Sequence, residues 1–208
     1  LNAAVRRVLL GENKVCGLTR EQDAQAAYEA GAIYGGLIFV DSSPRAVSEE
    51  QARKVIAAAP LSYVGVFRNA DIADVAAKAD ALSLSAVQLH GDEDQSYIDA
   101  LRAALAPQVQ IWKAQSVGDT LPSRNLNHVD KYVLDNGQGG TGQRFDWSLL
   151  NGEKLDNVLL AGGLSPDNCV EAAKTGCAGL DFNSGVESQP GIKDASKLAS
   201  VFKTLRAY

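Results

Sequence analysis

The chain has 208 residues and a formal net charge of −5, which fits one large domain or two small ones and excludes a broad basic surface for nucleic acid. No apolar run reaches the ~18 residues that span a bilayer, and no signal-peptide pattern opens the chain, so we expect no membrane partner. The odd set of cysteines, Cys16, Cys169 and Cys177, indicates free thiols in a reducing cytoplasm.

Residues 1–11 come before the first predicted strand and combine apolar side chains with Arg6 and Arg7. We expect a helical turn or two there, as a linker or the tail of a preceding domain. The chain begins with Leu1 and contains no methionine, so we also expect that it was processed or cut from a longer polypeptide.

From residue 12 to residue 208, β-rich runs alternate with helical patterns, one unit about every 25 residues. The predicted strands are residues 14–16, 34–40, 63–67, 86–89, 109–114, 132–134, 158–160 and 179–182. The predicted helix starts are Thr19 and Ser48 (capping boxes), Asp71, Asp94, Asp146, and Ser165 followed by Pro166. Residues 115–127 have poor helical periodicity, so we expect an irregular connection in place of the fifth helix.

Eight such units predict a (β/α)8 TIM barrel, a single α/β domain over residues 12–208, although the chain is shorter than the ~250 residues typical of the class. The rival fold is an open doubly wound sheet. That fold usually carries a G-x-G-x-x-G turn after its first strand, and residues 15–19 lack it. The barrel is therefore favoured.

The stretch from Lys131 to Trp147 is a strong candidate for chemistry. A β-rich run ends there on Asp135, and four glycines follow before Arg144. Dense glycines indicate unusual backbone angles or close approach of a ligand, and a carboxylate at such a point suits acid–base chemistry. The alternative is a solvated glycine turn with Asp135 as a cap. Arg144 could reach an anion, although a solvated charge is the simpler interpretation.

In a barrel of this kind, active sites lie on the loops at the carboxyl ends of the strands. We therefore expect Cys16 and Asp135 to lie at the same end of the barrel, the mouth formed by these loops. The other polar residues at these ends include Asp41, Arg45, Arg68, Gln88, His90, Lys113 and Asp181. The loops after the last two strands, residues 161–164 and 183–187, leave glycine amides open, which predicts a phosphate site; ordinary tight turns are the alternative.

Several motifs resemble those of phosphoribosylanthranilate isomerases. They are KVCGLT (14–19), GGLIF (35–39), SPR (43–45), VGVF (64–67), VQLHG (87–91), the Asp135 loop, LAGGL (160–164) and GLDFNSGVE (179–187). The resemblance covers the chain from about Glu12 to the end. It implies an Amadori rearrangement in tryptophan biosynthesis, from N-(5-phosphoribosyl)anthranilate to 1-(2-carboxyphenylamino)-1-deoxyribulose 5-phosphate, without metal or organic cofactor.

The resemblance also implies residue roles. Asp135 is the general acid that protonates the furanose ring oxygen, and Cys16 is the general base that removes the C2 proton. Arg45 clamps the anthranilate carboxylate, and Asp181 lines the site. The phosphate is held, chiefly through backbone amides, by Gly162, Gly163, Asn183 and Ser184. Relatives often have serine in place of Asn183; a backbone contact would survive that difference, whereas a hydroxyl contact would not.

These roles make opposite demands on the two catalytic groups. Asp135 must keep its proton, so its pKa must lie above the usual ~3.9, as it would in a dry site. Cys16 must lose its proton from a usual pKa of ~8.5, and Lys14 could lower that pKa from the same face of the first strand. The simpler alternatives are a small buried apolar residue for Cys16 and a solvated loop residue for Arg45.

Two other functions compete. An isomerase of an aminoimidazole carboxamide ribonucleotide would share the barrel and the phosphate site, but such enzymes usually rely on two carboxylates, and Cys16 occupies one of those positions. A non-catalytic phosphate-binding module would need neither Cys16 nor Asp135. The remaining reactive residues are interpreted as structural or surface groups: His90, His128, Cys169 and Cys177.

The expected ligand is a small phosphoribosyl compound. In enteric-type bacteria the activity that the motifs imply is often fused behind an indole-glycerol-phosphate synthase domain. We therefore expect this chain to be fused to, or derived from, such a protein, and otherwise to be a monomer.

Overall fold

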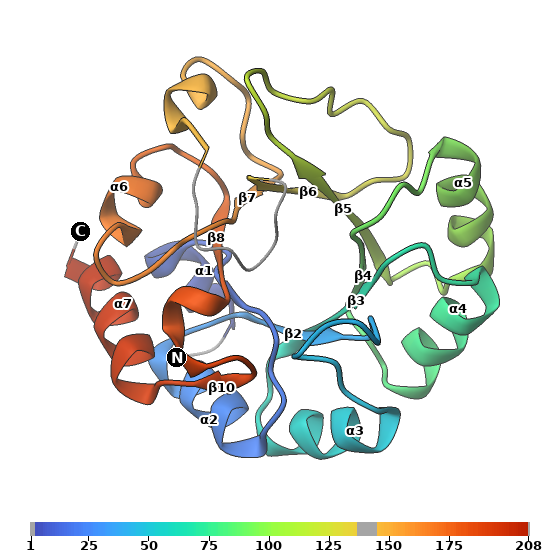
Figure 1. Cartoon of the computed structure of the whole chain (residues 1–208), viewed down its shortest axis with the longest axis horizontal. Coiled ribbons are helices and arrows are strands. Elements are labelled where there is room, and N and C mark those ends of the chain that lie inside the picture. Colours follow the sequence, from blue (N-terminus) through green and yellow to red (C-terminus); the bar gives the residue numbers. More distant parts are fainter. Residues whose placement is uncertain (1–2, 137–144, 208) are drawn as a thin grey trace.

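The computed structural model describes residues 3–136 and 145–207. Eight parallel strands follow one another in chain order around a closed barrel, so the predicted (β/α)8 fold is confirmed (Figure 1). The strands are β1 (Lys14–Val15), β2 (Tyr34–Ile38), β3 (Ser62–Phe67), β4 (Ala86–Leu89), β5 (Gln110–Ser116), β6 (Lys131–Asp135), β7 (Val158–Leu160) and β8 (Gly179–Phe182).

Helices surround this barrel in Figure 1. They are α1 (Ala3–Leu10), α2 (Glu21–Ala30), α3 (Glu49–Ala58), α4 (Ile72–Ala81), α5 (Gln95–Ala104), α6 (Cys169–Ala173) and α7 (Ala195–Ala207). Within the described residues 117–130, the connection from β5 to β6 contains no helix, as predicted. Two 3-10 turns, η1 (Trp147–Leu150) and η2 (Ser184–Val186), follow β6 and β8.

A short antiparallel hairpin was not predicted. It joins β9 (Glu187–Gln189) to β10 (Ile192–Lys193) through a turn at Gly191, whose φ is +80°. The hairpin leaves the barrel directly after η2 and carries two buried charged side chains, Glu187 and Lys193. The hairpin therefore places two charged side chains at the barrel mouth, although its sequence resembles that of an ordinary loop.

Two predicted helix starts, at Thr19 and Ser165, are wrong, although the Ser165 hydroxyl does accept a backbone hydrogen bond from Asp167. The Thr19 hydroxyl donates to the Gly191 carbonyl, so α2 begins after Arg20 instead. The Asn168 side chain accepts a hydrogen bond from the Ser165 amide and donates to the Gly163 carbonyl. Helix α6 therefore begins after Asn168 and not at Pro166. The predicted caps at Ser48 and Asp94 are confirmed, since each accepts the expected backbone hydrogen bond.

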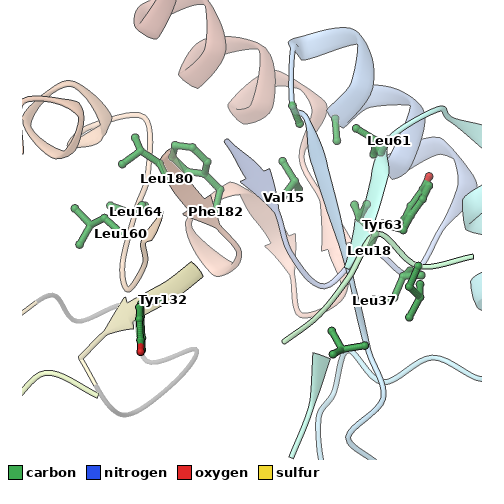
Figure 2. Close-up of a cluster of buried hydrophobic side chains, with 14 of the residues drawn as sticks. Val15, Leu18, Leu37, Leu61, Tyr63, Tyr132, Leu160, Leu164, Leu180 and Phe182 are labelled. Atoms are coloured by element: carbon green, nitrogen blue, oxygen red, sulfur yellow. The ribbon is translucent and has the colours of Figure 1, made fainter. Parts of the chain in front are cut away.

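Strand alternation divides the core into two parts. Side chains that point outward pack between the barrel and its helices, and Figure 2 shows part of this layer around Val15, Leu37, Tyr132 and Phe182. Side chains that point inward fill the barrel below its mouth, where the rings of Tyr34 and Trp112 meet edge to face at 4.9 Å. The interior below the mouth is therefore filled by side chains, and the residues for chemistry are expected at the carboxyl ends of the strands.

The N-terminal helix α1 packs against α7 and is anchored by Arg6, whose guanidinium lies 4.0 Å from the Tyr28 ring centroid. Leu10 joins the main core, whereas Val8 and Leu9 are exposed. Across the described residues, every helix is too short or too polar to span a bilayer.

Substitution of Gly179 by alanine should destabilise the barrel. A Cβ at this position would lie 2.2 Å from the Glu12 carbonyl oxygen, a backbone atom that has no rotamer to change. We expect a loss of about 1–3 kcal/mol in the free energy of unfolding, measured in urea. Gly118→Ala is the matched control because open space surrounds its Cβ. Equal urea midpoints for the two variants would contradict this packing account.

Candidate active site

A buried ion pair lies where the first and last strands of the barrel meet. Lys14 and Asp181 face each other in the β1–β8 register, and the Lys14 Nζ atom lies 2.7 Å from Asp181 Oδ2. Lys14 is fully buried. Asp181 Oδ1 is also buried and has no hydrogen-bond partner among the described residues. The ion pair therefore leaves one carboxylate oxygen of Asp181 buried without a donor from the described residues.

Cys16 lies beside this ion pair. A Cβ on Gly36 would sit 2.7 Å from Cys16 Sγ and 3.1 Å from Lys14 Cε, so the glycine makes room for both side chains. Burial raises the pKa of the Cys16 thiol, and Asp181 adds to this effect, while Lys14 and Lys193 oppose it. Lys14 thus acts in the predicted direction but does not prevail. The pKa of Cys16 therefore lies above its ordinary value, although Lys14 opposes the rise.

Asp135 ends β6 on the inward face of the barrel. Burial raises the pKa of its carboxyl group, as an acid role requires, although a hydrogen bond from the Asn136 amide and the nearby His90 oppose the rise. His90 itself is exposed at the mouth, with Nδ1 3.5 Å from Gln88 Nε2. The glycine cluster and Arg144, at residues 137–144, lie outside the described residues.

Arg45 is held by a carboxylate that sequence reasoning did not single out. Its Nε and Nη2 atoms donate to Glu187 Oε1 at 2.9 Å and Oε2 at 2.8 Å. Lys193 Nζ donates to the same Oε1 at 2.7 Å. Burial alone would raise the pKa of Glu187, but the contacts with Arg45 and Lys193 hold it below its usual value. Arg45 is thus buried and paired, so the solvated-arginine alternative is wrong.

The two glycine loops meet beside this cluster. Gly162 and Gly163 have φ angles of +88° and +64°, and a Cβ on Gly185 would lie 1.9 Å from the Leu164 carbonyl oxygen. Among the described residues, no hydrogen bond uses the backbone amides of Gly162, Gly163 or Ser184. Close packing of the loops therefore leaves several amides free for an anion, as predicted for a phosphate site.

The other candidates have structural contacts. Lys113 pairs with the buried Glu93 at 2.7 Å, and Cys169 is part of the main core. His128 is exposed near Asp99. The side chain of Asn183 accepts a hydrogen bond from Lys193 Nζ at 3.0 Å, so its side chain is already engaged. That contact favours the backbone role for Asn183 at the anion site.

Comparison with known proteins identifies the family. The family model described as N-(5'-phosphoribosyl)anthranilate (PRA) isomerase matches residues 13–204. The chain belongs to the PRA isomerase family. It is 78% identical over its whole length to the tryptophan biosynthesis protein TrpCF of Salmonella typhi, covering 46% of that protein, and 70% identical to TrpCF of Yersinia pestis, covering 44%. The chain thus spans about half the length of the curated relatives it matches.

Solved PRA isomerase structures share the architecture along nearly the whole chain. The enzyme from Thermus thermophilus has a TM-score of 0.83 and 30% identity, covering 94% of this chain and 98% of that chain. A PRA isomerase in complex with reduced 1-(o-carboxyphenylamino)-1-deoxyribulose 5-phosphate has a TM-score of 0.78 and 30% identity, covering 95% of this chain and 100% of its own. The PRA isomerase barrel is therefore common to all three.

The raised pKa of Asp135 predicts a stability cost at neutral pH. The folded chain binds this proton more tightly than the unfolded chain, so stability falls as pH rises from the unfolded pKa of ~3.9 through the higher folded pKa. Asp135→Asn removes the cost and should raise Tm at about pH 7 but not at about pH 3. Asp119→Asn, in an exposed loop, is the control. A lower Tm for Asp135→Asn at neutral pH would contradict the raised pKa of Asp135 and its cost in stability.

Proposed function

We propose that the chain catalyses the Amadori rearrangement of N-(5-phosphoribosyl)anthranilate to 1-(2-carboxyphenylamino)-1-deoxyribulose 5-phosphate. The observation that carries this proposal is the order of groups around the mouth. Asp135 ends β6 and Cys16 follows β1, while the two amide-rich loops follow β7 and β8, which lie between those strands in the barrel. A phosphate bound to these loops would place a sugar between an acid and a base.

The first step uses Asp135 in its protonated form. Its carboxyl group donates a proton to the furanose ring oxygen, the C1–O bond breaks, and the nitrogen lone pair forms a C1=N bond. The raised pKa of Asp135 supports this role because its carboxyl group keeps its proton to a higher pH than an ordinary aspartate does. The product of the step is a Schiff base with positive charge on nitrogen, and an Asp135 carboxylate.

The second step uses Cys16 as a thiolate. Burial disfavours the charged form of this thiol, so a nearby positive charge must favour its ionisation. The cationic Schiff base supplies that charge next to C2, in addition to Lys14. Cys16 releases its proton to solvent, the resulting thiolate removes the C2 proton, and the electron pair of the broken C2–H bond neutralises the nitrogen to give an enolamine. Tautomerisation of the enolamine yields the ketone.

Binding requires groups at both ends of the substrate. We assign the phosphate to the backbone amides of the 162–163 and 183–184 segments. The anthranilate carboxylate is assigned to Arg45, a planar and permanently charged group. Asp181 lines the site and offers its free Oδ1 atom to a sugar hydroxyl.

The surroundings of this barrel in the whole protein are also a proposal. Because TrpCF relatives are about twice as long as this chain, we propose that the barrel forms part of a longer polypeptide, next to an indole-glycerol-phosphate synthase domain. Residues 1–11 would then form the link and residues 12–208 the isomerase domain. Free thiols at Cys16, Cys169 and Cys177 support a cytoplasmic location.

Turnover of the fluorescent anthranilate adduct tests the function. Wild type should be active, and Cys16→Ala and Asp135→Asn should each lose about a hundredfold to ten-thousandfold in kcat while remaining folded. Cys177→Ala, which changes a partly exposed thiol outside the mouth, should retain wild-type activity. Binding of a reduced product analogue without turnover by wild type would indicate a binding module. Turnover only of an aminoimidazole carboxamide ribonucleotide would indicate the other isomerase.

A further inference from the structure

Glu187 is a buried carboxylate with no role in the proton transfers above. Its two oxygens receive hydrogen bonds from Arg45, Lys193 and the Gly191 amide. Burying a carboxylate is costly unless several donors satisfy it, and here two cations do so. The burial of these three charged groups therefore points to a function at the barrel mouth.

The geometry leaves one edge of Arg45 unoccupied. Glu187 binds the edge formed by Nε and Nη2, and no hydrogen bond to Nη1 is found among the described residues. A guanidinium group presents five N–H donors in a flat fork, so the Nη1–Nη2 edge remains able to bind a second carboxylate. Glu187 thus holds Arg45 and still leaves the Nη1–Nη2 edge available for the carboxylate of a substrate.

The stem of Arg45 is also fixed next to the catalytic thiol. A Cβ on Gly17, the residue after Cys16, would lie 2.8 Å from Arg45 Cδ and 2.9 Å from Asn183 Oδ1. Arg45 and Asn183 therefore both pack over the backbone at the end of β1. Glycine at position 17 allows this approach, and its φ of +71° also disfavours a side chain there.

Lys193 connects the same carboxylate to the anion loop. Its Nζ atom donates to Glu187 Oε1, to the Asn183 carbonyl at 3.3 Å and to Asn183 Oδ1 at 3.0 Å. Asn183 directly precedes η2, where the free amide of Ser184 lies. A chain of buried contacts thus runs from Arg45 through Glu187 and Lys193 to the phosphate loop.

We propose that Glu187 is a positioning residue that sets the separation between the carboxylate clamp and the phosphate loop, and so selects substrates that carry both anions. This inference rests on the proposed function. The cluster of Arg45, Lys193 and Glu187 keeps one surplus positive charge, which an incoming carboxylate can neutralise. Without Glu187, the two cations would repel each other and the fork of Arg45 would lose its fixed orientation.

The test compares two substrates in the folded enzyme. They are N-(5-phosphoribosyl)anthranilate and the corresponding phosphoribosyl aniline, which lacks the carboxylate. For Glu187→Gln we expect the KM of the anthranilate substrate to rise about tenfold or more, with kcat changed less than about threefold. The aniline substrate should show no such rise in KM. The preference of the enzyme for the carboxylate would therefore collapse in the variant.

Further variants test whether Glu187 acts on the KM through Arg45. In an Arg45→Gln background, Glu187→Gln should add little to the loss, because the clamp through which it acts is already absent. Glu50→Gln makes the same chemical change in an exposed ion pair with Lys54 and should leave both substrates unaffected. If Glu187→Gln fails to fold, Glu187→Asp keeps the charge but shortens its reach, and its loss should again be confined to the anthranilate substrate.

Equal losses for the two substrates, or an unchanged loss in the Arg45→Gln background, would overturn the inference and show a general structural role. An inactive wild type would instead overturn the proposed function, and the inference with it. The two failures are therefore distinguished by the wild-type assay alone.

Discussion

The buried ion pair between Lys14 and Asp181 links the closure of the barrel to its chemistry. Strand β1 is only two residues long, yet it must pair with both β2 and β8 for the barrel to close. Lys14 and Asp181 lie opposite each other at this seam. The same register places Cys16 on the inward face, beside Lys14, and leaves Asp181 Oδ1 without a hydrogen-bond donor from the described residues. The seam that closes the barrel thus also carries an ion pair that acts on the pKa of the thiol.

Charge balance around the mouth follows from this arrangement. Lys14, Lys193 and Arg45 face the carboxylates of Asp181 and Glu187 in buried ion pairs. One positive charge remains uncompensated by these pairs, and such a surplus favours either a thiolate or a bound anion. Burial opposes the charged form of the thiol. Burial therefore favours the neutral forms of both the Asp135 carboxyl group and the Cys16 thiol.

Much of this architecture could be predicted from sequence because it depends on local periodicity. The eight strands, the irregular connection at 115–127 and the shared mouth of Cys16 and Asp135 follow from strand patterns and the barrel rule. The helix start at Thr19 was mispredicted because a tertiary contact with Gly191 takes its hydroxyl, and the start at Ser165 because a local turn held by Asn168 precedes α6. Glu187 was missed as the partner of Arg45 because 142 residues separate them, and no local pattern marks such a pair. The resemblance between motifs, rather than physical reasoning, supplied the assignment of Cys16.

The claim that the Lys14–Asp181 ion pair acts on the Cys16 thiol is tested most directly by titration of Cys16. The titration is followed by thiolate absorbance, in a chain whose other two cysteines are replaced by alanine. The account predicts that the wild-type thiol titrates above the ordinary value for cysteine. It predicts further that Asp181→Asn, in a barrel that remains folded, lowers the pKa of Cys16, because the carboxylate no longer neutralises Lys14. A Cys16 pKa that is unchanged or higher in Asp181→Asn would contradict the claim that this ion pair controls the thiol.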